Sequence, residues 1–143
     1  MAEVTHIETN QRRLTLPADN KNLYKMIEFL KSDMDRYTVS QKKQFNLISA
    51  VEEIFANIAN YAYEKSGEVI ITTFVEEGTY YVRFSDNGKK YNPLKNKNPD
   101  ITSDLKDRKI GGLGVFLAKK LSDKISYANE NGKNVLTVGV SIL

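Results

Sequence analysis

Apolar residues recur at helical spacing in two stretches of the chain. The first predicts a helix that starts at Pro17 and packs through one apolar stripe, formed by Leu23, Met26, Ile27, Leu30 and Met34. The second predicts a helix over residues 40–63, capped by Ser40, with its apolar face formed by Phe45, Ile48, Val51, Phe55, Ile58, Ala59 and Ala62. An ordinary solvated helix carries Lys and Glu pairs on its exposed face. Here the opposite face carries mostly uncharged polar groups, namely Asn46, Ser49, Glu53, Asn57 and Asn60.

Other segments are rich in β-branched and aromatic residues and predict strands. Residues 68–75 and 79–85 form one hairpin across Glu77-Gly78, and residues 125–129 and 134–142 form another across residues 130–133. Residues 5–9 and 13–16 predict short edge strands, and residues 113–121 predict a short helix. Hairpins dominate the pairing, and helices are partly segregated from strands. We therefore expect an α+β fold, a two-layer sandwich with helices on one face of a mixed, mostly antiparallel sheet.

Composition narrows the class of protein. A chain of 143 residues suits one domain spanning residues 1–143, and 41% hydrophobic with 27% charged residues is ordinary for a globular protein. The absence of cysteine excludes disulfides and thiolate metal sites. No apolar run approaches the roughly 18 residues of a membrane span, and the first residues lack the apolar core of a signal peptide. We expect a cytoplasmic protein with no membrane partner.

Positive charge is concentrated in one segment. Residues 89–110 carry seven Lys and Arg against three Asp, a local charge of +4 in a chain whose formal total is +3. The same region has no sustained apolar period and is too long for an idle connection, so we predict a mobile lid at about residues 87–110. A plain solvated basic loop is the simpler interpretation of the charge alone.

Three short motifs occur in a fixed order. Glu53 and Asn57 are four residues apart on one helix face, where a carboxylate and an amide oxygen can address the same metal-bound phosphate. Asp86 ends a strand and precedes a turn at Gly88, which exposes the carboxylate. Glycines 111, 112 and 114 open a helix whose bare N–H groups can face an anion. Each pattern alone is common, but together they suggest an ATP site.

The three motifs resemble the N, first-glycine and second-glycine boxes of the ATP-binding fold of gyrase, histidine kinases and MutL. In its single-domain length and in the sequence of residues 50–63, AVEEIFANIANYAY, the chain resembles the anti-sigma-factor serine kinases. The resemblance implies a Bergerat-type fold that uses ATP and Mg²⁺. It also implies a STAS-type anti-anti-sigma protein as substrate and a sigma factor as the sequestered partner. We further expect a homodimer.

The resemblance also implies roles for individual residues. Glu53 would be the general base, Asn57 the Mg²⁺ ligand, and Asp86 the acceptor of the adenine amino group. Gly88 would let the purine lie flat, and Asn92 belongs to the nucleotide-binding set. Tyr61 stands where some relatives carry a histidine.

Further roles fall on the later part of the chain. Gly111, Gly112 and Gly114 would present amides to the phosphates, and Arg108 would stabilise the transferring phosphoryl group, with Lys106 and Lys109 as competitors. Thr137 corresponds to a strand threonine near the adenine. Its alternation with Leu136 and Val138, however, predicts that Thr137 lies on the less apolar face of its strand.

The predicted function is an ATP-dependent serine/threonine protein kinase. The sequence disfavours a phosphoacceptor-histidine kinase, because the sole histidine, His6, lies in a predicted strand and not on a dimerisation helix. The main alternative is a nucleotide-gated switch that sequesters a partner with little phosphotransfer, and the presence of Glu53 favours the enzyme. A small basic nucleic-acid-binding domain is a more distant alternative, because no aromatic-rich basic stripe supports direct contact with nucleic acid.

Overall fold

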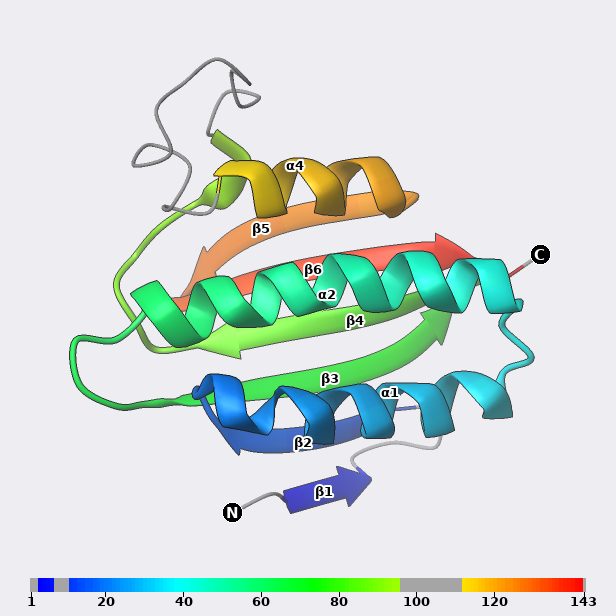
Figure 1. Cartoon of the computed structure of the whole chain (residues 1–143), viewed down its shortest axis with the longest axis horizontal. Helices are drawn as coiled ribbons and strands as arrows, with labels where there is room; N and C mark the ends of the chain where they lie inside the picture. Colours follow the sequence, from blue (N-terminus) through cyan, green and yellow to red (C-terminus); the bar gives the residue numbers. More distant parts are fainter. Residues whose placement is uncertain (1–2, 7–10, 96–111, 143) are drawn as a thin grey trace.

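The computed structural model describes residues 3–6, 11–95 and 112–142, and its framework is one sheet (Figure 1). Its six strands have the order β1-β2-β3-β4-β6-β5, and all five pairings are antiparallel. The strands are β1 (Glu3–His6), β2 (Arg12–Pro17), β3 (Glu68–Glu76), β4 (Thr79–Asp86), β5 (Lys124–Glu130) and β6 (Lys133–Ser141). The predicted α+β class is therefore confirmed, whereas the parallel component of the expected mixed sheet is absent from the described strands.

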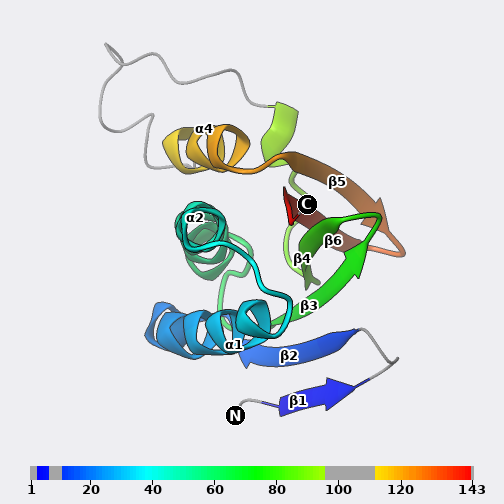
Figure 2. The ribbon, with the colours of Figure 1, turned by 90° about the vertical axis from the view of Figure 1, so that its right-hand side faces the viewer.

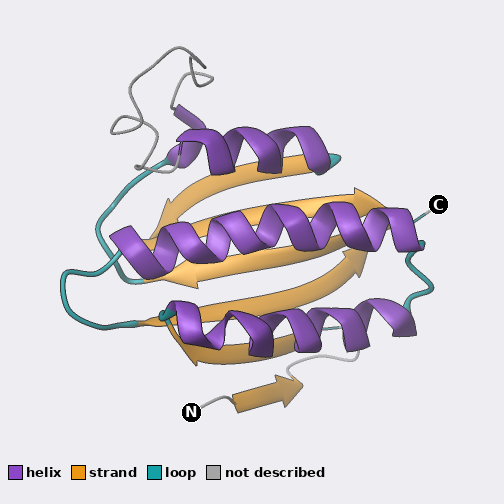
Figure 3. Cartoon of the chain, viewed as in Figure 1, coloured by secondary structure: helices purple, strands orange, loops and turns teal. Residues whose placement is uncertain are grey.

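Within the described residues, three α-helices form a second layer on one face of this sheet (Figures 2 and 3). They are α1 (Leu23–Arg36), α2 (Gln41–Tyr61) and α4 (Gly112–Leu121), and short 3₁₀ turns occur at η1 (Asn20–Asn22) and η2 (Pro93–Lys95). Helix α2 crosses the centre of the sheet between the other two helices. No helix among the described residues is both long and apolar enough to cross a lipid bilayer.

The core lies between the two layers because strand residues alternate between the faces. In β4, Tyr80, Val82 and Phe84 are at most 1% exposed, and in β6 Leu136, Val138 and Val140 continue the same face. Both predicted hairpin turns are present. Residues Glu77, Gly78, Asn131 and Gly132 all have positive φ, which is the geometry of two-residue hairpin turns that match the strand twist.

A buried polar cluster ties α1 to the sheet. The Asp33 carboxylate is fully buried and accepts hydrogen bonds from Tyr80 Oη at 2.6 Å, Arg12 Nη1 at 3.1 Å and Arg36 Nη1 at 3.2 Å. Burial, followed by the negative charge of Asp33, raises the pKa of Tyr80 well above its ordinary value. Tyr80 is therefore a neutral donor to a charged acceptor, which is one of the stronger kinds of hydrogen bond.

Several predicted boundaries and exposures were wrong. Pro17 ends β2 instead of starting a helix, and α1 begins at Leu23 after a 3₁₀ turn that Asp19 caps. Strand β2 is not an edge strand, since it pairs with both β1 and β3. Phe45 is 68% exposed because the adjacent Gln44 takes the buried position, where its amide donates to Val39 O at 3.0 Å. The Ser40 cap is confirmed, with Oγ accepting from Lys43 N at 3.2 Å.

Candidate functional site

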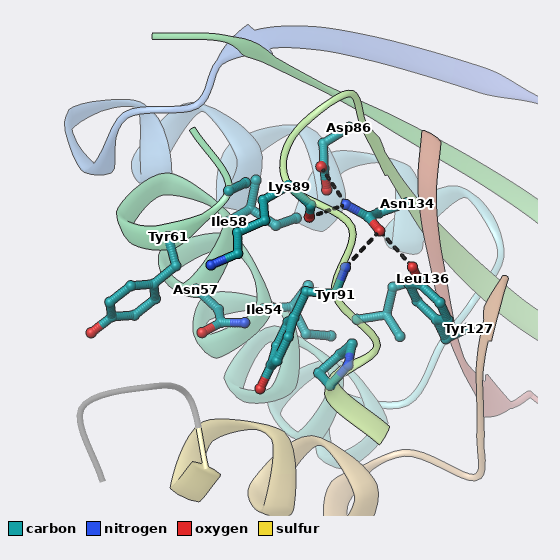
Figure 4. A pocket seen from close by; sticks show the side chains of 12 residues that line it. Ile54, Asn57, Ile58, Tyr61, Asp86, Lys89, Tyr91, Tyr127, Asn134 and Leu136 are labelled. Atoms are coloured by element: carbon teal, nitrogen blue, oxygen red, sulfur yellow. Dashed lines mark hydrogen bonds between the residues drawn. The ribbon is translucent and has the colours of Figure 1, made fainter. Parts of the chain in front are cut away.

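A cavity of about 240 Å³ opens between α2 and the ends of β4, β5 and β6 (Figure 4). The segment that follows β4 closes one side of it. Its lining is mainly apolar and aromatic, with a few polar groups, which is typical of a small-molecule site. The lining residues are Ile54, Asn57, Ile58, Tyr61, Ala62, Asp86, Lys89, Tyr91, Pro93, Tyr127, Asn134 and Leu136. The sequence motifs therefore contribute Asn57 and Asp86 to one cavity, although they lie on different elements.

Asp86 reaches this cavity because it is the last residue of β4 and shares the buried face of that strand with Phe84. The residue is 6% exposed. Its Oδ1 atom accepts hydrogen bonds from Gly88 N at 2.9 Å and from Asn134 Nδ2 at 3.0 Å. Among the described residues, no group donates to Oδ2, so this oxygen remains an acceptor at the cavity.

Asn134 holds the Asp86 carboxylate in place from the neighbouring strand. The two residues are cross-strand partners in the register of β4 and β6. The Asn134 amide donates to Asp86 Oδ1 and, at 2.9 Å, to Lys89 O. Its oxygen accepts from Tyr91 N at 3.2 Å and from Tyr127 Oη. All four hydrogen-bonding positions of the amide are therefore used, which fixes its orientation.

The turn after Asp86 is anchored by Tyr63, in the segment that follows α2. Tyr63 Oη accepts from Asn87 N at 2.9 Å and donates to Glu68 O at 2.6 Å. Burial raises the pKa of Tyr63, with a further contribution from the negative charge of Asp86. The neutral phenol thus connects the start of β3 with the end of β4, where the site carboxylate lies.

Gly88 has a packing role in the fold, whereas its role toward the purine stays a prediction. A Cβ atom at this position would lie 2.4 Å from Ala62 O and 2.7 Å from Ala62 Cβ, so the glycine allows the turn to pack against the end of α2. The backbone contact is completed by Lys89 N, which donates to Ala62 O at 2.8 Å. Gly88 is not among the residues that line the described cavity.

Asn57 and Glu53 differ in their position relative to the cavity. The Asn57 side chain lines the cavity from the last part of α2, as Figure 4 shows. Glu53 lies one turn earlier on the same helix, is exposed and is absent from the described lining. The two residues are therefore neighbours on one helix, but only the Asn57 amide lines the cavity.

The glycine-rich segment is described only in part. Helix α4 starts at Gly112, one residue earlier than predicted, and Gly114 lies in its first turn. Its N-terminal end lies beside the end of α2 that carries Asn57 (Figures 1 and 4). Gly111, Arg108, Lys106 and Lys109 lie outside the described residues, as do residues 96–110 of the predicted lid.

Two predicted residues do not join the cavity. Asn92 Oδ1 accepts from Leu94 N at 2.9 Å and so caps the η2 turn, while the following Pro93 provides the cavity wall. Thr137 lies on the other face of the sheet, opposite Arg83 and Ser126 in the register. It lines a separate groove on that face, as the alternation with Leu136 and Val138 indicated.

Asn134 and Tyr127 are site residues that the sequence reasoning missed. A usable signal was present, because residues 134, 136, 138 and 140 share one face of β6 and Asn134 is the only polar member of that buried series. Asp86 holds the corresponding position on β4. A polar residue on the buried, apolar face of a strand needs a hydrogen-bond partner, and here Asn134 and Asp86 are hydrogen-bonded to each other.

Comparison with known proteins assigns the chain to a family. The family model described as the histidine kinase-like ATPase domain matches residues 16–140. The serine-protein kinase RsbW of Listeria monocytogenes is 31% identical over 93 residues, which cover 61% of this chain and 59% of that protein. The serine-protein kinase RsbW of Halalkalibacterium halodurans is 26% identical over 92 residues, covering 58% and 54%. The chain thus matches less than two thirds of the length of these relatives.

A solved structure gives the same fold. The crystal structure of the RsbU and RsbW domains of Rv1364c from Mycobacterium tuberculosis covers 94% of this chain, which in turn covers 33% of that chain. The TM-score is 0.67 at 13% sequence identity, a likeness in fold. Since the family model spans most of the sequence, the chain belongs to the histidine kinase-like ATPase domain family.

Proposed function

We propose that this chain binds ATP with Mg²⁺ and transfers the γ-phosphoryl group to a serine or threonine of a partner protein, as a kinase of the anti-sigma-factor type. The observation that carries the proposal is the presence of Asn57 and Asp86 in the lining of one cavity, in a member of this ATPase family. The names of the relatives, serine-protein kinases, support the choice of acceptor.

The base of the nucleotide fits the Asp86 end of the cavity. Oδ2 of this buried carboxylate has no donor among the described residues, and an adenine amino group would supply one. Apolar walls from Ile54, Ile58 and Leu136 suit the faces of a purine ring. The volume of about 240 Å³ is below the roughly 300–1,000 Å³ of complete small-molecule sites, so the described cavity suits the base, and the phosphates would extend toward Asn57 and α4.

Mg²⁺ fits the site as a companion of the nucleotide. Among the described residues, no group of three or more His, Cys, Asp or Glu side chains could hold a metal ion alone. Mg²⁺ is commonly bound through one or two protein oxygens together with substrate phosphates and water, and the Asn57 amide oxygen can be such a ligand. When bound, the ion would neutralise charge on the phosphates.

Glu53 is the proposed general base. One helical turn separates it from Asn57, and its exposure leaves it accessible to the side chain of a docked protein. As the acceptor oxygen attacks the γ-phosphorus, the bond from that phosphorus to the bridging oxygen breaks and ADP leaves. Glu53 takes the hydroxyl proton. Such positioning of a nucleophile near the γ-phosphate is the main task of a phosphotransfer enzyme.

The partners form part of the same proposal. We propose a STAS-domain anti-anti-sigma protein as the phosphoacceptor, a sigma factor as the sequestered protein, and a cytoplasmic location. Residues 1–143 would act as one ATP-binding unit. A homodimer is also proposed, supported by the sheet face that no described helix covers (Figure 2), and sedimentation of the purified chain at twice the monomer mass would test it.

A second candidate is a nucleotide-gated switch that binds its partner with little phosphotransfer. One observation favours it, because Glu53 is exposed and outside the cavity that Asn57 and Asp86 line. A protein that only binds the nucleotide needs the metal ligand and the acceptor of the adenine amino group, but it does not need a general base for catalysis.

The experiment that separates the two candidates measures transfer of labelled γ-phosphate to a purified STAS-domain protein. In the kinase, Glu53→Gln lowers the rate by about 10²–10⁴-fold and leaves ATP affinity unchanged, because the amide cannot take a proton. Glu52→Gln is the matched control, since it alters the adjacent carboxylate of the same helix. Tight ATP binding by the wild-type chain without any labelled acceptor would support the switch, and full transfer by Glu53→Gln would remove this residue as the base.

A further inference from the structure

We propose that Asn134 selects the base of the nucleotide: by occupying one oxygen of Asp86, it makes the cavity accept adenine and reject guanine. This inference rests on the proposed nucleotide-binding function and adds a residue that determines specificity. The acceptor positions of the buried Asp86 carboxylate are divided between the protein and the ligand.

The two oxygens of Asp86 are not equivalent. An ionised carboxylate offers about four acceptor positions, two on each oxygen. Gly88 N and Asn134 Nδ2 take both positions of Oδ1, at 2.9 and 3.0 Å. Within residues 3–6, 11–95 and 112–142, nothing donates to Oδ2. The carboxylate can therefore serve a ligand through one oxygen only.

The amide of Asn134 cannot turn over to release Oδ1. Its oxygen is held by two donors, Tyr91 N and Tyr127 Oη, and its second N–H is held by Lys89 O. A flip would place Nδ2 against these two donors and the oxygen against two acceptors, Asp86 Oδ1 and Lys89 O. Because the residue is only 7% exposed, water could not compensate for these losses.

Adenine and guanine make different demands on such a carboxylate. The adenine edge presents one amino donor beside the acceptor N1, so a single oxygen satisfies it. The guanine edge presents two adjacent donors, N1–H and the 2-amino group, which pair with both oxygens of a free carboxylate. With Oδ1 occupied, one guanine donor would be buried without a partner, and a site built in this way rejects the wrong ligand strongly.

The test compares the affinities of the full chain for ATP and GTP, each with Mg²⁺, by titration calorimetry. The wild-type chain should prefer ATP by about 10- to 100-fold, the usual cost of one buried unpaired donor. Asn134→Val removes the donor to Oδ1 and should reduce this ratio by about tenfold. Asn134→Thr has nearly the same shape but keeps one hydroxyl donor, so it should retain most of the preference.

Asn129→Val is the matched control, because Asn129 is the cross-strand partner of Asn134 on β5, is exposed and does not line the cavity. Its ATP/GTP ratio should equal that of the wild type. A folded Asn134→Val variant with an unchanged ratio would overturn the inference. Should that variant not fold, the wild-type ratio decides, since equal affinities for ATP and GTP contradict a selective Asp86.

The failure of the proposed function would look different. A wild-type chain that binds neither ATP nor GTP refutes nucleotide binding, and the selection by Asn134 then fails with it. A chain that binds ATP tightly, but whose preference does not depend on the donor at position 134, leaves the proposed function standing and refutes only the role of Asn134.

Discussion

Replacing Asp86 with alanine should weaken ATP binding by about 1.5–3 kcal/mol, or roughly 10- to 150-fold in Kd. The estimate follows from one hydrogen bond between the adenine amino group and the charged Oδ2 oxygen, in a residue that is only 6% exposed and thus poorly screened by water. The assay is titration calorimetry of wild type and variant with ATP and Mg²⁺.

The same substitution also lowers stability, and the control must account for this loss. Asp86→Ala deletes the acceptor of Gly88 N and Asn134 Nδ2, and the latter becomes a buried donor without that partner. Asp123→Ala provides a matched control. The Asp123 carboxylate also accepts two hydrogen bonds, from Lys43 Nζ and Ser141 N, both at 2.7 Å, but lies outside the cavity.

The two variants should therefore separate affinity from stability. Both should unfold at lower temperature than the wild type, and both are assayed below their unfolding transitions. Only Asp86→Ala should lose ATP affinity. An Asp86→Ala variant that is folded and binds ATP as tightly as the wild type would refute the role of this carboxylate as the acceptor of the adenine amino group.

Two further substitutions test other parts of the site. Asn57→Ala should reduce the part of ATP affinity that depends on Mg²⁺, because it deletes the proposed oxygen ligand from an otherwise intact helix; equal losses in calorimetry with and without Mg²⁺ would exclude the metal role. Gly88→Ala should lower the free energy of unfolding by about 1–3 kcal/mol, since its Cβ would lie 2.4 Å from Ala62 O and force the turn to move. An unchanged denaturation midpoint would show that the turn tolerates a side chain there.

Much of the fold could be predicted because its signals are local. The Glu77-Gly78 and Asn131-Gly132 turns define two hairpins through the backbone conformations that they permit, and the Ser40 hydroxyl marks the start of α2. Helix periodicity was less reliable for individual side chains. Phe45 suited the predicted stripe, but the buried position belongs to Gln44, whose amide donates to Val39 O and to Asp35 Oδ1.

The site was predictable where a residue belongs to a local pattern: Asp86 is the last residue of β4, before a turn, and Asn57 lies in the last part of α2. The rest depends on strand register, which brings Asn134 opposite Asp86 across β4 and β6 although they are 48 residues apart in sequence. The resemblance suggested Thr137 for the cavity, whereas the two-residue period of β6 directs it to the other face. Similarly, the turn sequence indicated that Gly88 is needed for a close approach of the backbone, but its contact with Ala62 depends on tertiary packing.

The central claim is that the cavity between α2 and the ends of β4 and β6 holds the base of ATP. A crystal structure of the chain with a non-hydrolysable ATP analogue and Mg²⁺ tests it most directly. We expect the adenine amino group at about 2.7–3.2 Å from Asp86 Oδ2 and the phosphates on the side of Asn57. An analogue bound elsewhere, or bound in this cavity with its base turned away from Asp86, would contradict it.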